Sequence, residues 1–150
     1  MSPATAVAAA AAKPRPLTSR AFEVAMAPVP VHVTQMRQFT AAFMRLWAVP
    51  VPLAEDVLVV VSELVTNAIK HGHGAVGLRV RCYDGELLLE VSDDNPSPAQ
   101  LRAAADDDVC GRGLFLVAVL SRDWGVGNDG RTTWAAFHNQ LERPCWAPST

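Results

Sequence analysis

The chain has 150 residues, of which 50% are hydrophobic and 19% charged. A chain of this length buries about 68–70% of its unfolded surface, which is enough for one compact domain. The formal net charge of -2 gives no broad basic field, so we expect no direct nucleic-acid partner. The three cysteines are too few and too scattered for a disulfide framework or a zinc site, which favours reduced thiols in a cytoplasmic protein.

The two ends of the sequence differ in composition from its middle. Residues 1–20 are rich in alanine and proline, and Lys13 and Arg15 follow the alanine block, which reverses the order of a secretory signal. The longest later apolar run, Leu114–Leu120, is far shorter than the roughly 20 residues that span a bilayer. We therefore expect a tail over 1–20, one domain over 21–142, a second tail over 143–150 and no membrane segment.

Hydrophobic periodicity predicts the first elements of the domain. Apolar residues alternate at Phe22–Met26, which indicates a strand, and recur at helical spacing over His32–Trp47. Two prolines separate that helix from a second one at Leu53–His71. Gly72 is a typical stop signal for this second helix.

Four further strands and one helix follow. Asp84-Gly85 is a strong two-residue hairpin signal, and residues 93–108 are polar, as in a loop or lid. The predicted elements are strands Val76–Tyr83 and Glu86–Ser92, helix Gly111–Arg122, and strands Trp124–Val126 and Thr132–Phe137. The order β-α-α-β-β-α-β-β predicts an α/β (α+β) fold, a two-layer sandwich whose mixed sheet is covered on one face by helices.

Three polar side chains recur at four-residue spacing on the second predicted helix: Glu63, Asn67 and His71. Steps of four place them on one stripe, while the remaining faces are apolar and expected to be buried. An Asn amide oxygen suits Mg²⁺, and a Glu one turn earlier is placed to orient or deprotonate an attacking hydroxyl. The alternative is that these residues are exposed on an ordinary surface helix.

Asp93 follows a predicted strand and precedes Asp94-Asn95-Pro96. A carboxylate only accepts hydrogen bonds, so it can recognise an exocyclic amine such as N6 of adenine. The alternative is a turn-forming Asp with no ligand.

Gly111-Arg112-Gly113-Leu114 begins the third predicted helix. Glycines at a helix N-terminus let backbone N–H groups approach phosphate oxygens, and Arg112 would add a charge-assisted contact. Such a short pattern is weak by itself. The dinucleotide-binding fingerprint does not fit, because a third glycine and a preceding strand are missing.

In this order, the three patches resemble the N, G1 and G2 boxes of the GHKL ATPase/kinase superfamily. The sequence Ser62–Gly72, reading SELVTNAIKHG, is most similar to the anti-sigma-factor serine/threonine kinase branch. Gly130–Ala135, reading GRTTWA, is similar to a further motif of that branch. The resemblance covers roughly residues 22–138. It departs from the superfamily at residues 93–97, where both glycines of Asp-x-Gly-x-Gly are absent.

The resemblance implies a Bergerat-type site for ATP and Mg²⁺. By position, Glu63 is the catalytic base and Asn67 the Mg²⁺ ligand, Asp93 holds the adenine amine, and Thr132 or Thr133 helps to bind the adenine edge. The implied nucleotide-binding residues are Asn67, His71, Asp93, Asn95, Gly111, Arg112, Gly113, Leu114, Thr132 and Thr133.

The resemblance also implies a function and partners. The expected activity is transfer of the γ-phosphoryl group of ATP to a Ser or Thr of a small anti-anti-sigma-like protein, with sequestration of a sigma factor as a further role. Apolar residues of the helix Val33–Trp47 suggest a homodimer. The alternative is a non-catalytic, ATP-dependent binding module that sequesters a regulatory partner. A third possibility is a histidine-kinase catalytic domain. Such a domain would be expected to follow a long helical segment with a phosphoacceptor His, and the residues before 22 contain no such segment, which counts against it.

Overall fold

The structure is a computed structural model that describes residues 20–94, 109–127 and 130–139, with only the backbone described for 109–112. The predicted tails, apart from Arg20, and the lid over 95–108 lie outside these ranges. The elements in chain order are β1 (Arg20–Met26), α2 (Val31–Leu46), α3 (Val51–His71), β2 (Val76–Tyr83), β3 (Glu86–Ser92), α4 (Val109–Leu120), β4 (Asp123–Val126) and β5 (Thr132–His138).

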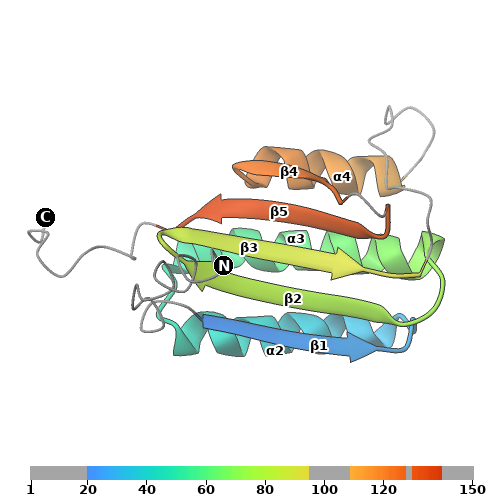
Figure 1. Cartoon of the computed structure of the whole chain (residues 1–150), viewed down its shortest axis with the longest axis horizontal. Helices are drawn as coiled ribbons and strands as arrows, with labels where there is room; N and C mark the ends of the chain where they lie inside the picture. Colours follow the sequence, from blue (N-terminus) through green and yellow to red (C-terminus); the bar gives the residue numbers. More distant parts are fainter. Residues whose placement is uncertain (1–19, 95–108, 128–129, 140–150) are drawn as a thin grey trace, which may run out of the picture.

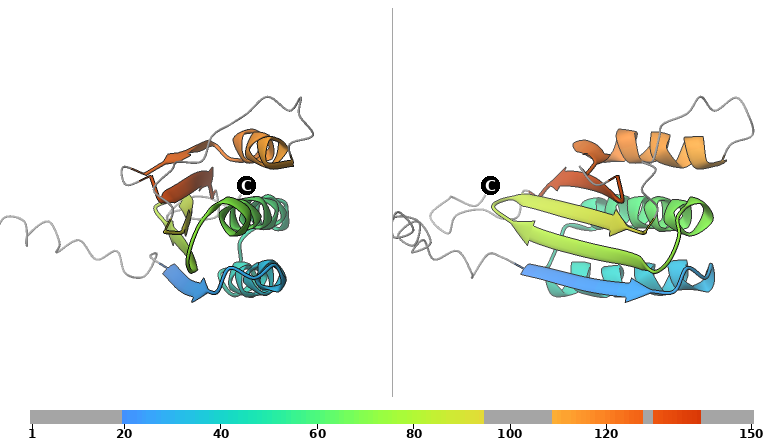
Figure 2. Two further views of the ribbon diagram at one scale, coloured as in Figure 1. Left: turned by 90° about the vertical axis from the view of Figure 1, so that its right-hand side faces the viewer. Right: turned by 45° about the vertical axis from the view of Figure 1, so that its right-hand side comes forward.

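The predicted two-layer architecture is confirmed. Five strands form one sheet, and α2, α3 and α4 lie side by side in a single layer on one of its faces (Figure 1, Figure 2). All eight predicted elements are present in the predicted order. Their ends differ from the prediction by two residues or fewer, and α4 begins two residues before the expected Gly111.

The sheet has the order β1-β2-β3-β5-β4, and every neighbouring pair is antiparallel. A mixed sheet was expected, so this detail differs from the prediction. The reason is that two helices, rather than one, connect β1 to β2, which reverses the chain once more than a βαβ crossover does. In the same way β5, and not β4, pairs with β3 after α4.

The β2–β3 hairpin turns at Asp84 and Gly85, whose φ angles are 50° and 75°. Positive φ at both central positions is the geometry of a type I′ turn, for which Asp-Gly is well suited. Beside this turn the buried Asn139 donates its backbone N–H to Gly85 O at 2.7 Å, and its side-chain amide lies 3.1 Å from the Sγ of buried Cys82. The turn and the end of β5 are thereby held together.

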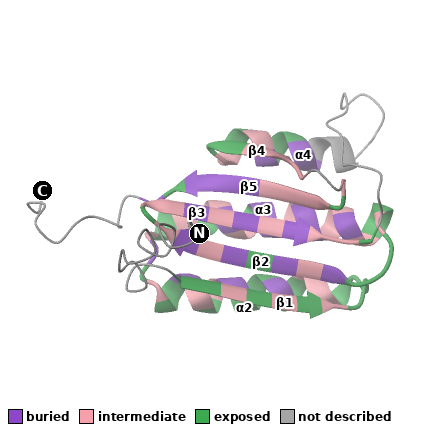
Figure 3. Ribbon diagram, viewed as in Figure 1, coloured by how far each residue is buried: buried purple, intermediate pink, exposed green. Residues whose placement is uncertain are grey.

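The core lies between the two layers. Alternate residues of β2 and β3 are buried there, as Figure 3 shows, and they pack against α3, the central helix. At the edge, Phe22 of β1 stacks on Phe43 of α2 with ring centroids 4.4 Å apart. The fully buried or nearly buried side chains of α3 are Val57, Val60, Val61, Leu64, Val65 and Ala68.

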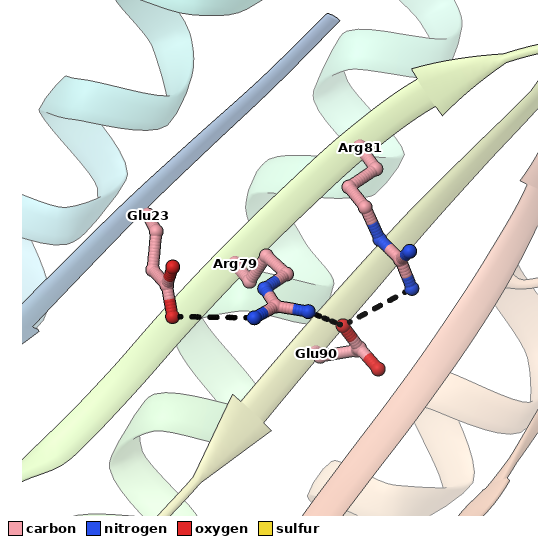
Figure 4. Close-up of polar contacts among 4 residues, drawn as sticks. All are labelled: Glu23, Arg79, Arg81 and Glu90. Atoms are coloured by element: carbon pink, nitrogen blue, oxygen red, sulfur yellow. Dashed lines mark hydrogen bonds and ion pairs between the residues drawn. The ribbon is translucent and has the colours of Figure 1, made fainter. Parts of the chain in front are cut away.

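The other face of the sheet is polar, and no described helix covers it. Arg79 lies between Glu23, at 3.6 Å, and Glu90, at 3.7 Å, and Arg81 approaches Glu90 at 3.4 Å (Figure 4). These groups are partly exposed, so each pair contributes at most about 1 kcal/mol to stability. This face is typical of an antiparallel sheet with one side in water. Within the described ranges no helix is long and apolar enough to cross a membrane.

Candidate functional site

The segments that carry the three sequence motifs meet at one end of the helix layer. The end of α3, the end of β3, the start of β5 and the start of α4 lie on the same side of the molecule (Figure 1). This arrangement follows from the topology, because α3 and β3 run toward that side and α4 and β5 run away from it. Three motifs far apart in the sequence therefore converge.

Helix α3 carries the polar stripe of Glu63, Asn67 and His71. Glu63 and Asn67 are half-buried, and His71, the last residue of the helix, is exposed. Neither Glu63 nor Asn67 is fully exposed, as the alternative of an ordinary surface helix expected, and six apolar residues of α3 are buried against the sheet and the neighbouring helices. Two polar side chains one turn apart thus lie at the border of the core.

Asp93 lies directly after β3 and against the end of α3. Its backbone N–H donates to Arg131 O at 3.0 Å, which continues the pairing of β3 with β5. A Cβ built on Gly72 would lie 2.5 Å from Cγ and 2.6 Å from Oδ2 of Asp93. The Asp93 carboxylate therefore occupies the space that a side chain at position 72 would need.

Asp94 and Gly74 hold the same corner together. The backbone N–H of Asp94 donates to His73 O at 2.7 Å. Gly74 has φ +74°, and its missing Cβ position is filled by the Asp94 carboxylate. The sequence prediction assigned no role to Gly74 or Asp94 and treated Gly72 only as a helix stop. Two glycines spaced by one residue between a helix and a strand were the available signal.

Gly113 of α4 lies against Glu63 of α3. A Cβ built on Gly113 would lie 2.6 Å from Glu63 Oε1, and Gly113 is buried. The glycine motif and the proposed base are therefore neighbours in space, although 50 residues separate them in the sequence (113 minus 63). Lack of a side chain at 113 is what lets the carboxylate reach this position.

The start of α4 differs slightly from the prediction. The helix begins at Val109, two residues before the expected Gly111, so Gly111 and Arg112 are its third and fourth residues rather than its first and second. The N–H groups of the N-cap and of the first three helical residues have no partner within the helix, so Gly111, the third residue of α4, keeps a backbone donor of the kind expected for phosphate. Leu114 is 2% exposed and belongs to the core. Asn95 and the Arg112 side chain lie outside the described part.

Thr132 and Thr133 lie on opposite faces of the sheet. Thr133 is paired with Val91, which is buried in the core, so it lies on the face toward α3. Thr132 is paired with Ser92, and both line a shallow hollow of about 170 Å³ on the outer face, beside Arg79 and Glu90. Of the two threonines, Thr133 is the one on the side of Glu63 and Asn67.

The donor set fits a magnesium nucleotide. Mg²⁺ is usually held by one or two protein oxygens together with phosphates and water, rather than by an all-protein cage. Asn67 and Glu63 supply an amide oxygen and a carboxylate one turn apart, and in the described ranges no group of three or more His, Cys, Asp or Glu could hold a metal alone. Asp93, which follows β3, places a further carboxylate against the end of α3.

A family model for the histidine kinase-like ATPase domain matches residues 26–137, well over half of the chain. The chain therefore belongs to this family, and the resemblance to the GHKL superfamily is confirmed. Membership supports ATP binding, typically with Mg²⁺, and a kinase-like use of ATP. Among curated proteins the chain has no significant match.

Proposed function

We propose that this protein is a serine/threonine protein kinase of the anti-sigma-factor type, which phosphorylates a small regulatory protein partner. The observation that carries the proposal is that Gly113 and Asp93, from two other parts of the chain, both lie against α3, the helix that carries Glu63. The Glu63 carboxylate lies against Gly113, and the Asp93 carboxylate lies against Gly72 at the end of the same helix. The proposed reaction needs a general base, a helix N-terminus that contains glycine, and an acidic side chain that recognises adenine.

When bound, Mg-ATP would supply the γ-phosphoryl group and leave as Mg-ADP, and the metal would neutralise the charge that develops during transfer. Glu63 accepts the proton of the attacking Ser or Thr hydroxyl at a carboxylate oxygen, and its half-buried position keeps it near the apolar core. Asn67 would hold the metal through its amide oxygen. Asp93 accepts a hydrogen bond from the adenine amine, and Thr133, on the same face of the sheet, contacts the adenine edge.

The backbone of the first turn of α4 completes the site. The N–H group of Gly111 lies where the helix dipole favours negative charge, and it would donate to a phosphate oxygen of the bound nucleotide. Most of catalysis in phosphoryl transfer comes from such positioning and charge stabilisation. One base, one metal ligand and one helix N-terminus are therefore enough for the proposed chemistry.

Glu63→Gln tests the base. The amide keeps the size of the side chain but cannot accept the proton, so transfer of labelled phosphate from ATP to candidate anti-anti-sigma-like proteins should fall by about 100-fold or more, while ATP affinity stays within about twofold. The matched control is Glu55→Gln, an exposed carboxylate on the same helix.

The same experiment decides between the kinase and the binding module. Labelled partner from the wild-type protein and the Glu55→Gln variant, but not from Glu63→Gln, supports the kinase. ATP binding without any labelled partner supports the module that sequesters a regulatory protein. Equal labelling by all three proteins removes Glu63 from the role of base.

A further inference from the structure

The corner that holds Asp93 is built from three consecutive residues of the α3–β2 connection. Gly72 leaves room for the Asp93 carboxylate, His73 accepts the Asp94 N–H at 2.7 Å, and Gly74 leaves room for the Asp94 carboxylate. We call residues 72–74 the glycine turn. Each of its residues contacts one of the two aspartates that follow β3.

The backbone at Asp93 is held from two sides. Its own N–H donates to the carbonyl oxygen of Arg131, the residue directly before β5, at 3.0 Å, and the N–H of Asp94 donates to His73 of the glycine turn. Consecutive backbone donors are thus tied to segments on either side of β3. This fixes where the Asp93 Cα lies, and the surface of Gly72 then limits where its carboxylate can lie.

A side chain at position 72 would change that direction. A Cβ there would meet Cγ of Asp93 at 2.5 Å, a separation that real Cβ atoms essentially never show, so the carboxylate would have to turn away. The same Cβ would lie 2.5 Å from Ala68 O, a backbone atom of α3 that yields less readily. Rotation of the Asp93 side chain relieves the first of these contacts, and a small shift of the backbone at residue 72 relieves the second. Both changes alter the direction of the carboxylate relative to α3.

We propose that the glycine turn is a positioning device that aims the Asp93 carboxylate and so sets the preference for adenine over guanine. The proposal rests on the proposed role of Asp93 in reading adenine. Adenine presents an amine donor at N6, whereas guanine presents an acceptor oxygen at the corresponding position. A correctly aimed carboxylate accepts from the first and repels the second, so its direction decides the selectivity.

The test compares Gly72→Ala with Gly77→Ala by calorimetric titration of ATP and GTP in the presence of Mg²⁺. Gly77 is a matched control, because a Cβ there would also meet a polar side chain, Ser92 Oγ at 2.9 Å, but on the outer face of the sheet. Gly72→Ala should reduce the ratio of GTP to ATP dissociation constants by about tenfold or more, the effect of one lost hydrogen bond to a charged group. Gly77→Ala should leave it unchanged.

A folded Gly72→Ala protein that keeps the wild-type ratio overturns the proposal. Circular dichroism shows whether the variant is folded. If it is not, the pair Asp94→Pro and Asp94→Ala decides, because only proline removes the N–H that donates to His73 O. The ratio of GTP to ATP dissociation constants should fall further in Asp94→Pro than in Asp94→Ala. Equal ratios in the two variants overturn the proposal.

The wild-type titration separates this proposal from the proposed function. A wild-type protein that binds ATP and GTP equally contradicts the role of Asp93 itself, before any variant is compared. The other outcome is that the wild-type protein prefers ATP and no variant changes the ratio of GTP to ATP dissociation constants. That result leaves the role of Asp93 in binding adenine intact and contradicts only the positioning role of the glycine turn.

Discussion

At the scale of single residues, the site depends on close contacts between side chains and glycines. Glu63 and Asp93 each occupy the space that a side chain at Gly113 or Gly72 would fill. Both glycines thus act through the groups that they allow to approach.

Asn67 is the residue whose replacement separates metal binding from nucleotide binding. Asn67→Ala removes the amide oxygen, so ATP affinity measured with Mg²⁺ should fall by at least about tenfold, whereas affinity measured with a chelator present should change little. Thr66→Ala is the control, because Thr66 is the neighbouring half-buried position on α3 but points about 100° away around the helix. An equal loss of ATP affinity with and without Mg²⁺ would contradict the role of Asn67 as the metal ligand.

The sequence predicted candidate residues for the site but not the contacts between them. Four-residue spacing on a helix is enough to place Glu63 and Asn67 on one stripe, because helix geometry is regular. The contacts of Gly72 with Asp93 and of Gly113 with Glu63 depend on how α3, α4 and β3 pack, and no local pattern encodes that. Asp94 was overlooked for the same reason, since its partner His73 precedes it by two elements of the fold.

At the scale of elements, strand β5 separates two threonines that the sequence could not tell apart. Thr133 lies on the face toward α3, and Thr132 lies beside the outer hollow. Thr133→Val, which keeps the shape but removes the hydroxyl, should weaken ATP binding by about threefold to tenfold, as expected for one neutral hydrogen bond. Thr132→Val should leave ATP affinity unchanged, and the opposite ranking of the two variants would contradict the proposed adenine edge.

The sequence predicted the ends of the elements to within two residues, because their apolar periods are regular. β2 and β3 agree with the prediction at every residue, since an Asp-Gly turn fixes the hairpin between them. The direction of strand pairing was not predicted correctly. A sequence of elements leaves open whether β4 or β5 lies next to β3, and that choice, made by packing, decides between a mixed and an antiparallel sheet.

At the scale of the whole molecule, stability depends on the layer of side chains between sheet and helices. Leu89 of β3 is fully buried, whereas Leu46 of α2 is 73% exposed. Leu89→Ala should lower the free energy of unfolding by about 2–5 kcal/mol, and Leu46→Ala should change it by no more than about 0.5 kcal/mol. Urea unfolding of both variants measures these changes in the free energy of unfolding. Similar losses of stability in the two variants would contradict the position of the core between the sheet and the helices.

The central claim is that the end of α3 and the end of β3 together bind a magnesium-bound adenine nucleotide. Titration calorimetry of the wild-type protein with ATP, ADP and GTP, each with and without Mg²⁺, tests it most directly. We expect ATP to bind more tightly than GTP, and ATP affinity to increase when Mg²⁺ is added. Equal affinity for ATP and GTP, or no effect of Mg²⁺, would contradict the roles of Asp93 and Asn67.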